Sequence, residues 1–237
     1  MALLWSLVVV DSLIIISTVL CGLAGMVTML FDRTGDVSIP IARFWARTIC
    51  WAARTKVKVE GMDQLEPGKN YILCTNHLSY MDTPVVLSSI RLRFRFMAKS
   101  ELFKIPFMGT HLTQAGHVPV VLDDARAAIR TLTHAAKMIH ERQISLLIFP
   151  EGGRSEDGTL QPFKEGAAYL AIKAQVPLVP MALIGTHEVL PMHGKVFRAG
   201  TVRLKIGTPI PTEGTTLRDR GALTDAVREN IAAMLED

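Results

Sequence analysis

The stretch Tyr71–Asp82, YILCTNHLSYMD, and the Thr83-Pro84 pair that follows it decide the fold. The apolar run at its start is typical of a buried strand, whereas Thr83-Pro84 is typical of an N-cap and a first helical residue. A strand that passes directly into a helix is the repeating unit of α/β proteins, whose functional side chains gather at the carboxyl ends of parallel strands. His77 and Asp82 lie in this turn, so the stretch predicts both a fold class and the position of a site.

The rest of the chain continues the alternation. Helical segments fill the gaps between strand-like segments; the clearest begins at Asp123-Asp124, and the last is expected over Thr215 to Leu235. This order predicts an α/β fold with a mainly parallel central sheet flanked by helices. Seven strands are expected, at Val57–Glu60, Tyr71–Thr75, Phe94–Ala98, Val118–Val121, Ser145–Phe149, Leu178–Leu183 and Val202–Ile206.

The composition is uneven along the chain. The 237 residues are 49% apolar with a mean hydropathy of +0.28, and 23 of the first 31 residues are apolar. One membrane-like segment and three cysteines exclude a disordered chain, a collagen, a polytopic transporter and a disulfide-rich miniprotein. The net charge of +4 suits an anionic surface or substrate, and since no nucleic-acid-binding motif accompanies it we expect no nucleic-acid partner.

The segment Ser12–Phe31 is the membrane-like one. It contains 20 residues without a charge, which as a helix spans a bilayer core at ~1.5 Å per residue. A cleaved signal peptide is not expected, because no basic residue precedes the segment. Three placements stay open: a helix that crosses the membrane, a helix that lies in one leaflet, and a buried core helix. Lys and Arg crowd the C-terminal flank, so the positive-inside rule places the following domain in the cytoplasm.

A second amphipathic helix is expected from Ser38. On a helical wheel its arginines share one side, while apolar residues take the opposite side. This pattern is typical of an interfacial helix on an anionic membrane, and equally of a helix that covers the core with a solvated basic face. We expect residues 1–55 to be membrane-anchoring helices and 56–237 to be the globular domain. The basic residues are Arg43, Arg47 and Arg54, and the opposite ones are Ile41, Trp45, Ile49 and Ala52.

His77 and Asp82 have the residue types of a general base and its orienting partner. Five positions apart, they would lie about 140° apart on a regular helix, so they meet only if the chain turns between them. A histidine near neutral pKa can take a proton from an alcohol, while a carboxylate on its other ring nitrogen fixes the tautomer. The alternative is that His77 and Asn76 only cap the loop.

A second motif, Phe149–Ser155 or FPEGGRS, follows another apolar strand. Its two glycines allow backbone N–H groups to approach an anion, and Arg154 offers a planar pair of donors that matches a phosphate. The motif lacks the Walker spacing and its lysine, so a plain glycine turn with a surface arginine remains an alternative.

Together these motifs resemble the PlsC-like glycerolipid acyltransferases over roughly residues 55–212, and among them most closely the bacterial enzymes that acylate 1-acylglycerol 3-phosphate. Two residues depart from the family pattern: Gly153 replaces the usual threonine, and Met181 replaces the usual valine. The four blocks of the family are matched in order, N-H-x-x-x-x-D by Asn76, His77 and Asp82, K-x-x-L-x-x-x-P-x-x-G by Lys99, Leu102, Pro106 and Gly109, F-P-E-G-T-R-S by Phe149, Pro150, Glu151, Gly152, Arg154 and Ser155, and V-P-x-x-P-V by Val176, Pro177, Val179 and Pro180. Weaker matches follow at Phe163–Ala167 and Gly207–Ile210.

The resemblance implies an activity. A fatty acyl group passes from acyl-CoA or acyl-acyl-carrier-protein to the sn-2 hydroxyl of 1-acylglycerol 3-phosphate (lysophosphatidic acid), giving phosphatidic acid, at the cytoplasmic face of a bacterial inner membrane. His77 is then the general base and Asp82 its orienting partner, with no covalent acyl-enzyme. The residues implied around the acceptor's phosphate are Lys99, Glu151, Gly152, Gly153 and Arg154. Those implied for the acceptor or acyl pocket are Asn76, Pro106, Gly109, Ser155, Val176, Pro177 and Pro180, although Val176–Pro180 also fits a buried edge strand.

Other chemistries are less well matched. No cofactor is implied beyond the acyl donor, and no metal is expected because Cys21, Cys50 and Cys74 lack ligand spacing. The alternatives are an acyltransferase for another acceptor, such as lyso-ornithine lipid, another lysophospholipid or glycerol 3-phosphate, a membrane-bound serine hydrolase that uses Ser79 or Ser155, and a noncatalytic lipid-binding protein. The hydrolase lacks its G-x-S-x-G motif.

The segment around Arg93 has a period-two pattern. Arg91, Arg93 and Arg95 alternate with apolar residues, which predicts a strand with one basic face. We expect that face to be solvated; the alternative is that it binds the phosphates of coenzyme A or an acidic carrier protein.

Overall fold

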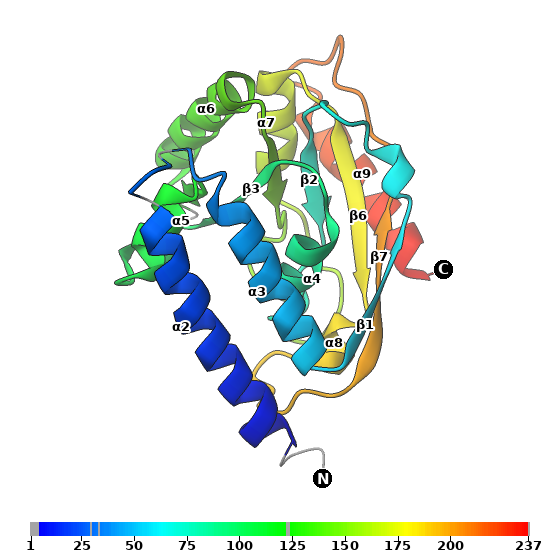
Figure 1. Cartoon of the computed structure of the whole chain (residues 1–237). Helices are drawn as coiled ribbons and strands as arrows, with labels where there is room; N and C mark the ends of the chain where they lie inside the picture. Colours follow the sequence, from blue (N-terminus) through cyan, green and yellow to red (C-terminus); the bar gives the residue numbers. More distant parts are fainter. Residues whose placement is uncertain (1–4, 29, 33, 122–123, 237) are drawn as a thin grey trace.

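The computed structural model describes residues 5–28, 30–32, 34–121 and 124–236. Its centre is a seven-stranded sheet, covered by helices on both faces (Figure 1). Neighbouring strands are parallel throughout except for the antiparallel pair β6 and β7. The predicted α/β fold with a mainly parallel sheet is confirmed. In spatial order the strands are β1 (Thr55–Glu60), β7 (Gly200–Ile206), β6 (Leu178–Ile184), β2 (Ile72–Thr75), β5 (Ser145–Ile148), β3 (Phe94–Lys99) and β4 (Val118–Val120).

The strands follow the apolar pattern of the sequence. All seven form within two residues of their predicted bounds. In β2, Ile72 and Cys74 point to one face of the sheet and Leu73 points to the other, as the period of two requires. Because all three side chains are 0% exposed, this strand is buried on both faces, which is typical of the centre of a parallel sheet.

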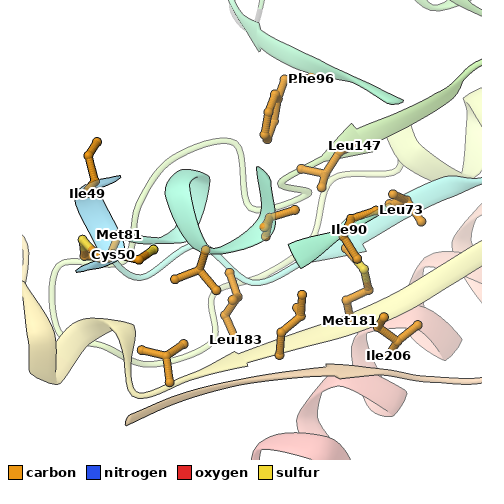
Figure 2. Close-up of a cluster of buried hydrophobic side chains, with 14 of the residues drawn as sticks. Ile49, Cys50, Leu73, Met81, Ile90, Phe96, Leu147, Met181, Leu183 and Ile206 are labelled. Atoms are coloured by element: carbon orange, nitrogen blue, oxygen red, sulfur yellow. The ribbon is translucent and has the colours of Figure 1, made fainter. Parts of the chain in front are cut away.

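Two hydrophobic cores lie on opposite faces of the sheet. One is packed between the sheet and helices α3 (Ser38–Ala52) and α4 (Asp82–Ser89); Figure 2 shows Cys50 of α3 beside Met81, in the same cluster as strand residues such as Leu183. The other is covered by α6 (Ala125–Arg142), α7 (Gly166–Ala174) and α9 (Arg220–Glu236). Short elements complete the described chain: η2 (Met62–Gln64), η3 (Ser100–Lys104), α5 (Met108–Gln114) and α8 (Thr186–Val189).

The ends of two helices test the sequence predictions. Helix α6 is capped by Asp124, whose carboxylate accepts hydrogen bonds from the backbone N–H groups of Arg126 and Ala127 at 2.9 and 3.0 Å, as predicted; Asp123 lies outside the described residues. Helix α9 begins at Arg220, later than the predicted Thr215. The reason is a local turn in which Asp219 accepts hydrogen bonds from the Thr216 backbone and hydroxyl, at 2.7 and 2.8 Å.

The N-terminal region forms a helical hairpin. The π-helix η1 (Trp5–Val10) runs directly into α2 (Asp11–Thr28), and α3 returns beside it (Figure 1). Together η1 and α2 make a 24-residue helix that is long and apolar enough to cross a membrane, with a hydropathy of 2.4. In its apolar 18-residue stretch, 11% of the residues are buried. This exposure contradicts the placement as a buried core helix. The boundary predicted at residues 55 and 56 stays a prediction, and α3 shares a core with the sheet.

The exposed face of α3 differs from the predicted basic face. Arg43 points into the protein, where Nη2 donates hydrogen bonds to the carbonyls of Ile90 and Leu92 at 3.0 and 2.8 Å. The Arg54 guanidinium lies over the ring of Trp5, 3.9 Å from its centroid. Arg47 stays exposed, but its neighbours there are Phe44 and Trp51, which are 64% and 71% exposed. The predicted basic face is therefore present only in part: Arg47 and Arg54 are exposed, whereas Arg43 bonds to carbonyls within the protein.

Arg95 of β3 is buried, and Arg93, directly before the strand, shares its partner. Arg95 is 1% exposed, and its Nη2 donates to Asp36 Oδ1 at 2.7 Å, while Arg93 Nε donates to the same oxygen at 2.9 Å. Burial by itself would raise the pKa of Asp36, but the hydrogen bonds from both arginines lower it to about 2. The expected solvated face is therefore wrong for Arg95, whereas Arg91 and Arg93 are exposed as expected. Asp36, in the loop between α2 and α3, ties the hairpin to the sheet.

Candidate active site

His77 and Asp82 face each other across the turn that links β2 to α4. The Nδ1 atom of His77 lies 2.8 Å from Oδ2 of Asp82. The same oxygen accepts hydrogen bonds from the backbone N–H groups of Leu78 and Ser79 at 2.7 and 2.8 Å. The chain therefore turns between the two residues, as their spacing requires. Since Asp82 is 0% exposed and held by three donors, it fixes the orientation of the imidazole.

The imidazole of His77 is buried against an aromatic ring. Its centroid lies 3.8 Å from that of Phe149 at an interplanar angle of 18°, and the residue is 8% exposed. Burial lowers the pKa of His77; Asp82 opposes this, while the positive charges of Arg154 and Lys99 add to it. The ring is therefore neutral at pH 7. With Nδ1–H donated to Asp82, Nε2 is left as the proton acceptor.

The backbone of His77 is held by the second motif. Glu151 accepts a hydrogen bond from the His77 N–H at 2.6 Å through Oε1, and one from the Gln161 N–H at 2.9 Å through Oε2. The Ser155 N–H donates to the His77 carbonyl at 2.8 Å. Burial raises the pKa of Glu151 to about 7, although the hydrogen bonds from the Gln161 and His77 N–H groups lower it. The carboxylate that the resemblance places beside a phosphate thus joins the two motif loops.

Arg154 is held in place over the turn. Its Nε donates to the carbonyl of Ser79 at 3.2 Å, and its guanidinium lies 4.2 Å from the centroid of the Tyr80 ring. Gly152 has φ of +77°, and a Cβ there would lie 3.0 Å from both Cε and Nζ of Lys164. Glycine therefore allows this backbone and lets the lysine pack closely on the loop. A Cβ at Gly153 would meet nothing within 4 Å, so this departure from the family pattern leaves the fold of the loop intact.

A cavity of about 640 Å³ opens beside His77. Its polar lining comes from the ends of the strands and the loops after them, and its apolar lining comes mainly from β3 and α6, with Val120 and Val121 at the end of β4. The polar group includes His77, Lys99, Gly152, Gly153, Arg154 and Lys164. The apolar group includes Val120, Val121, Ala125, Ala128, Ile129 and Leu132. One cavity thus joins a proton acceptor, cationic side chains and a hydrocarbon-like wall.

Several predicted pocket residues do not line this cavity. Asn76 is 0% exposed, and its side-chain amide pairs with the backbone of Leu183, donating to the carbonyl at 2.9 Å and accepting from the N–H at 2.8 Å. The resemblance also places Pro106, Gly109, Ser155, Val176, Pro177 and Pro180 at the pocket, and they too lie outside its lining. Leu178 pairs with Ile72, so Val176 and Pro177 lie at the end of the sheet opposite to His77. The alternative of a buried edge strand is right about burial, since Val179 and Pro180 are buried within β6, but wrong about the edge, because β6 lies between β7 and β2.

Other residues were not singled out for the site from the sequence. Tyr80 lies between the two members of the His77–Asp82 pair, and no pattern distinguishes it from a surface aromatic. Lys164 lies in the weaker family match at Phe163–Ala167, and the position of that match after the third block could have identified it. Arg220 lines the cavity and forms an ion pair with Glu165 at 2.5 Å; no local signal marks it.

The nucleophiles of the alternative enzyme classes are engaged elsewhere. Ser79 is 0% exposed and its hydroxyl donates to the Leu190 carbonyl at 2.5 Å. Ser155 is 1% exposed and its hydroxyl donates to Asp157 at 2.8 Å. Cys74 is fully buried, and burial raises its pKa to about 12, so its thiol stays protonated. This geometry disfavours a serine hydrolase and a cysteine nucleophile.

Comparison with known proteins gives consistent matches. A family model described as "Acyltransferase" matches residues 56–184. The chain is 34% identical over 163 residues to a 1-acyl-sn-glycerol-3-phosphate acyltransferase of Limnanthes douglasii, covering 69% of this chain and 54% of that protein. It is 29% identical over 182 residues to the human 1-acyl-sn-glycerol-3-phosphate acyltransferase alpha, covering 77% and 64%. The chain therefore spans 54% and 64% of the length of these two curated relatives.

The structure also matches a solved one over nearly its whole length. The crystal structure of the 1-acyl-sn-glycerophosphate acyltransferase PlsC from Thermotoga maritima superposes with a TM-score of 0.79 at 25% identity. The match covers 100% of this chain and 98% of that one, so it includes the N-terminal hairpin as well as the sheet.

Proposed function

The chain belongs to the acyltransferase family, and we propose that it transfers a fatty acyl group from acyl-CoA or acyl-acyl-carrier-protein to the sn-2 hydroxyl of 1-acylglycerol 3-phosphate. The product is phosphatidic acid. The observation that carries the proposal is the His77–Asp82 pair, 2.8 Å apart, beside a cavity that also holds Lys99 and Arg154. An alcohol, a phosphate and an acyl chain each find a matching group there.

The proposed reaction begins with proton transfer to His77. Nε2 takes the proton of the acceptor's hydroxyl as that oxygen attacks the thioester carbonyl carbon. Asp82 stabilises the resulting imidazolium through Nδ1–H. The tetrahedral intermediate then breaks its carbon–sulfur bond, and the thiolate leaves with the proton held by His77. No acyl-enzyme forms, which agrees with the engaged serine hydroxyls and the protonated Cys74.

The proposed site for the acceptor's phosphate is formed by cations around the glycine turn. Arg154 uses Nε for the Ser79 carbonyl, which leaves its terminal nitrogens for a phosphate. Lys99, exposed at the end of β3, and Lys164, packed on Gly152, line the same cavity and add positive charge. The backbone of Gly152 and Gly153 completes this proposed site.

For Glu151 we propose a positioning role in place of phosphate contact. Both of its carboxylate oxygens accept backbone N–H groups, one from His77 and one from Gln161. A carboxylate would repel a phosphate at close range, whereas the bond to the His77 N–H fixes the peptide that carries the base.

The hairpin supports a membrane location. We propose that the helix Trp5–Thr28 and the exposed aromatic residues of α3 hold the enzyme at the cytoplasmic face of a bacterial inner membrane, where the acceptor lies. The basic residues that follow the apolar segment agree with this orientation. A crossing helix and a helix within one leaflet both satisfy this proposal.

An acceptor panel tests the function. Purified full-length protein in detergent is given labelled acyl-CoA or acyl-acyl-carrier-protein with 1-acylglycerol 3-phosphate, glycerol 3-phosphate, lysophosphatidylcholine, lyso-ornithine lipid or monoacylglycerol. Label is then counted in lipid and in free fatty acid. We expect label in phosphatidic acid, and a clear preference for the phosphomonoester that Arg154→Ala removes. Equal use of phosphate-free acceptors would contradict the phosphate site, and label in free fatty acid would favour a hydrolase.

A further inference from the structure

The corner between η3 and α5 exposes an apolar surface that the proposed reaction does not use. Ile105, Phe107 and Met108 are 44%, 75% and 47% exposed, and they follow one another closely in the chain. Phe107 is among the most exposed aromatic residues of the described chain. A cluster of this kind on a protein surface marks a site of interaction.

The backbone of this corner is built to project Phe107. The Met108 N–H donates to the Pro106 carbonyl at 2.8 Å, and Phe107 has φ of 65° and ψ of −51°. This is the rare, strained form of the γ-turn, in a region that favours glycine. Gly109 closes the corner, because a Cβ there would lie 1.9 Å from the carbonyl oxygen of Phe103. The block containing Pro106 and Gly109 thus forms a turn that holds a phenylalanine in solvent.

The corner lies beside the apolar hairpin and reaches the cavity. Helix α5 lies beside the C-terminal half of α2 in Figure 1, and a Cβ at Gly25 of α2 would lie 3.2 Å from the His111 ring of α5. Leu23 and Val27 are 56% and 57% exposed on the side of α2 that points away from α5, because each lies two positions, about 200° of helix, from Gly25. On its other side the corner leads back to Leu102, which lines the cavity and is 38% exposed.

Cationic residues flank the corner. Lys104 ends η3 directly before it, and Lys99 ends β3 at the cavity; both are exposed. An apolar tip with lysines behind it matches a membrane interface, where hydrocarbon lies beneath anionic headgroups. A soluble protein partner would leave the exposed apolar residues of α2 beside it uncovered.

We propose that Ile105, Phe107 and Met108 form a second membrane-inserting surface, which enters the acyl-chain region of the leaflet beside the mouth of the cavity. This inference rests on the proposed function for its lipid acceptor, but it concerns a surface separate from the reacting groups. Insertion at this corner opens the cavity, at Leu102, to the hydrocarbon in which the acceptor's acyl chain lies.

The test measures partition of the full-length protein into vesicles of equal parts phosphatidylcholine and phosphatidylglycerol, without substrate. Phe107→Gly removes the ring and relieves the backbone strain, so we expect an unchanged thermal midpoint and a partition constant about tenfold lower. Phe107→Leu should keep most of the binding. The matched control is Val59→Ser, which changes a 38% exposed apolar residue on β1, at the opposite edge of the sheet, and should bind like the parent. Parent-like partition of Phe107→Gly, or an equal loss in Val59→Ser, would overturn the proposal.

A second measurement does not depend on the stability of the glycine variant. Phe107→Trp adds a fourth tryptophan, and lipids brominated in their acyl chains should quench the emission that it adds over the parent. Emission that stays unquenched in vesicles would overturn the insertion. Neither measurement uses catalysis, so a chain that binds through Phe107 but transfers no acyl group would refute the proposed function and leave this inference standing.

Discussion

The N-terminal hairpin and the sheet bury their apolar residues in opposite ways. Strand β2 has apolar side chains that are 0% exposed on both faces, whereas in α2 Ile15, Val19 and Leu20 are more than half exposed. Both regions carry apolar runs in sequence, but within the described chain the sheet covers these side chains whereas α2 leaves most of them exposed. The difference supports the proposal that the hairpin's apolar face meets lipid, whereas the sheet buries its own apolar side chains around the site.

The two regions are joined by polar contacts as well as by the core under α3. Asp36 binds Arg95 of β3 and Arg93 directly before that strand, and Arg43 binds the carbonyls of Ile90 and Leu92. Such bonds have defined directions, so they fix the tilt of the hairpin relative to the strand that ends at Lys99. The proposed membrane depth of the enzyme and the position of the site are thereby set by the same contacts.

Removing His77 should give the largest effect, and it should affect catalysis at the sheet without affecting membrane binding by the hairpin. His77→Ala should lower the rate of acyl transfer by about a thousandfold or more, because it removes the proton acceptor that Asp82 orients at the cavity. Vesicle binding and the thermal midpoint should stay as in the parent, since the hairpin is untouched. Rates are measured by acyl transfer and folding by circular dichroism. A variant that retains activity would exclude His77 as the general base.

Removing the contacts of Asp36 with Arg93 and Arg95, the joint between hairpin and sheet, should affect both regions at once. Asp36→Ala leaves the buried guanidinium of Arg95 without its carboxylate, which we expect to cost about 3 kcal/mol of unfolding free energy. Urea unfolding at neutral pH measures this loss. The matched control is Asp63→Ala, an aspartate of η2 outside the joint, which should change stability by less than about 0.5 kcal/mol. Equal effects of the two substitutions would show that Asp36 does not tie the hairpin to the sheet.

These contacts also show which part of the structure the sequence could predict. The seven strands and the turn between His77 and Asp82 depend on neighbours within a few positions, so periodicity and spacing were sufficient for them. The partners of Arg95 and Glu151 were not accessible in this way. Asp36 lies 59 positions from Arg95, and the His77 N–H lies 74 positions from Glu151. Long-range pairing of polar groups leaves no periodic pattern, and the family resemblance supplied the residues of the site without their contacts.

The pH dependence of stability should report the link between the two motif loops. The pKa of Glu151 is raised to about 7, above its ordinary value near 4.5, so burial favours the protonated form in the folded chain. Its stabilising contribution is then full below pH 4.5 and is lost as the pH rises through about 7. Glu151→Gln lacks this titration. The advantage in thermal midpoint of the native chain over the variant should therefore shrink by a few degrees from pH 5 to pH 8.

Other groups should change stability with pH in the opposite direction. The quantity to measure is therefore the difference in thermal midpoint between the native chain and Glu151→Gln. Burial lowers the pKa of His77, so its contribution is present above its ordinary pKa and is lost as the pH falls. Both proteins share that titration, and it cancels in the difference. A midpoint difference that is constant from pH 5 to pH 8 would contradict the raised pKa of Glu151.

The smallest expected effect concerns Tyr80, which belongs to the turn after β2 but, unlike the buried strand, is half exposed. Its ring lies 4.2 Å from the Arg154 guanidinium, and such a contact contributes about 0.5–1 kcal/mol at an exposed site. Tyr80→Ala should thus raise the KM for 1-acylglycerol 3-phosphate about threefold to fivefold with little change in kcat, because the ring positions the cation and takes no part in proton transfer. Tyr80→Phe keeps the aromatic face and should restore the KM, which separates stacking from any role of the hydroxyl. A loss of kcat in both variants, or a KM that Tyr80→Phe fails to restore, would assign the Tyr80 hydroxyl to the chemistry. An unchanged KM in Tyr80→Ala would instead show that the Ser79 carbonyl alone holds Arg154.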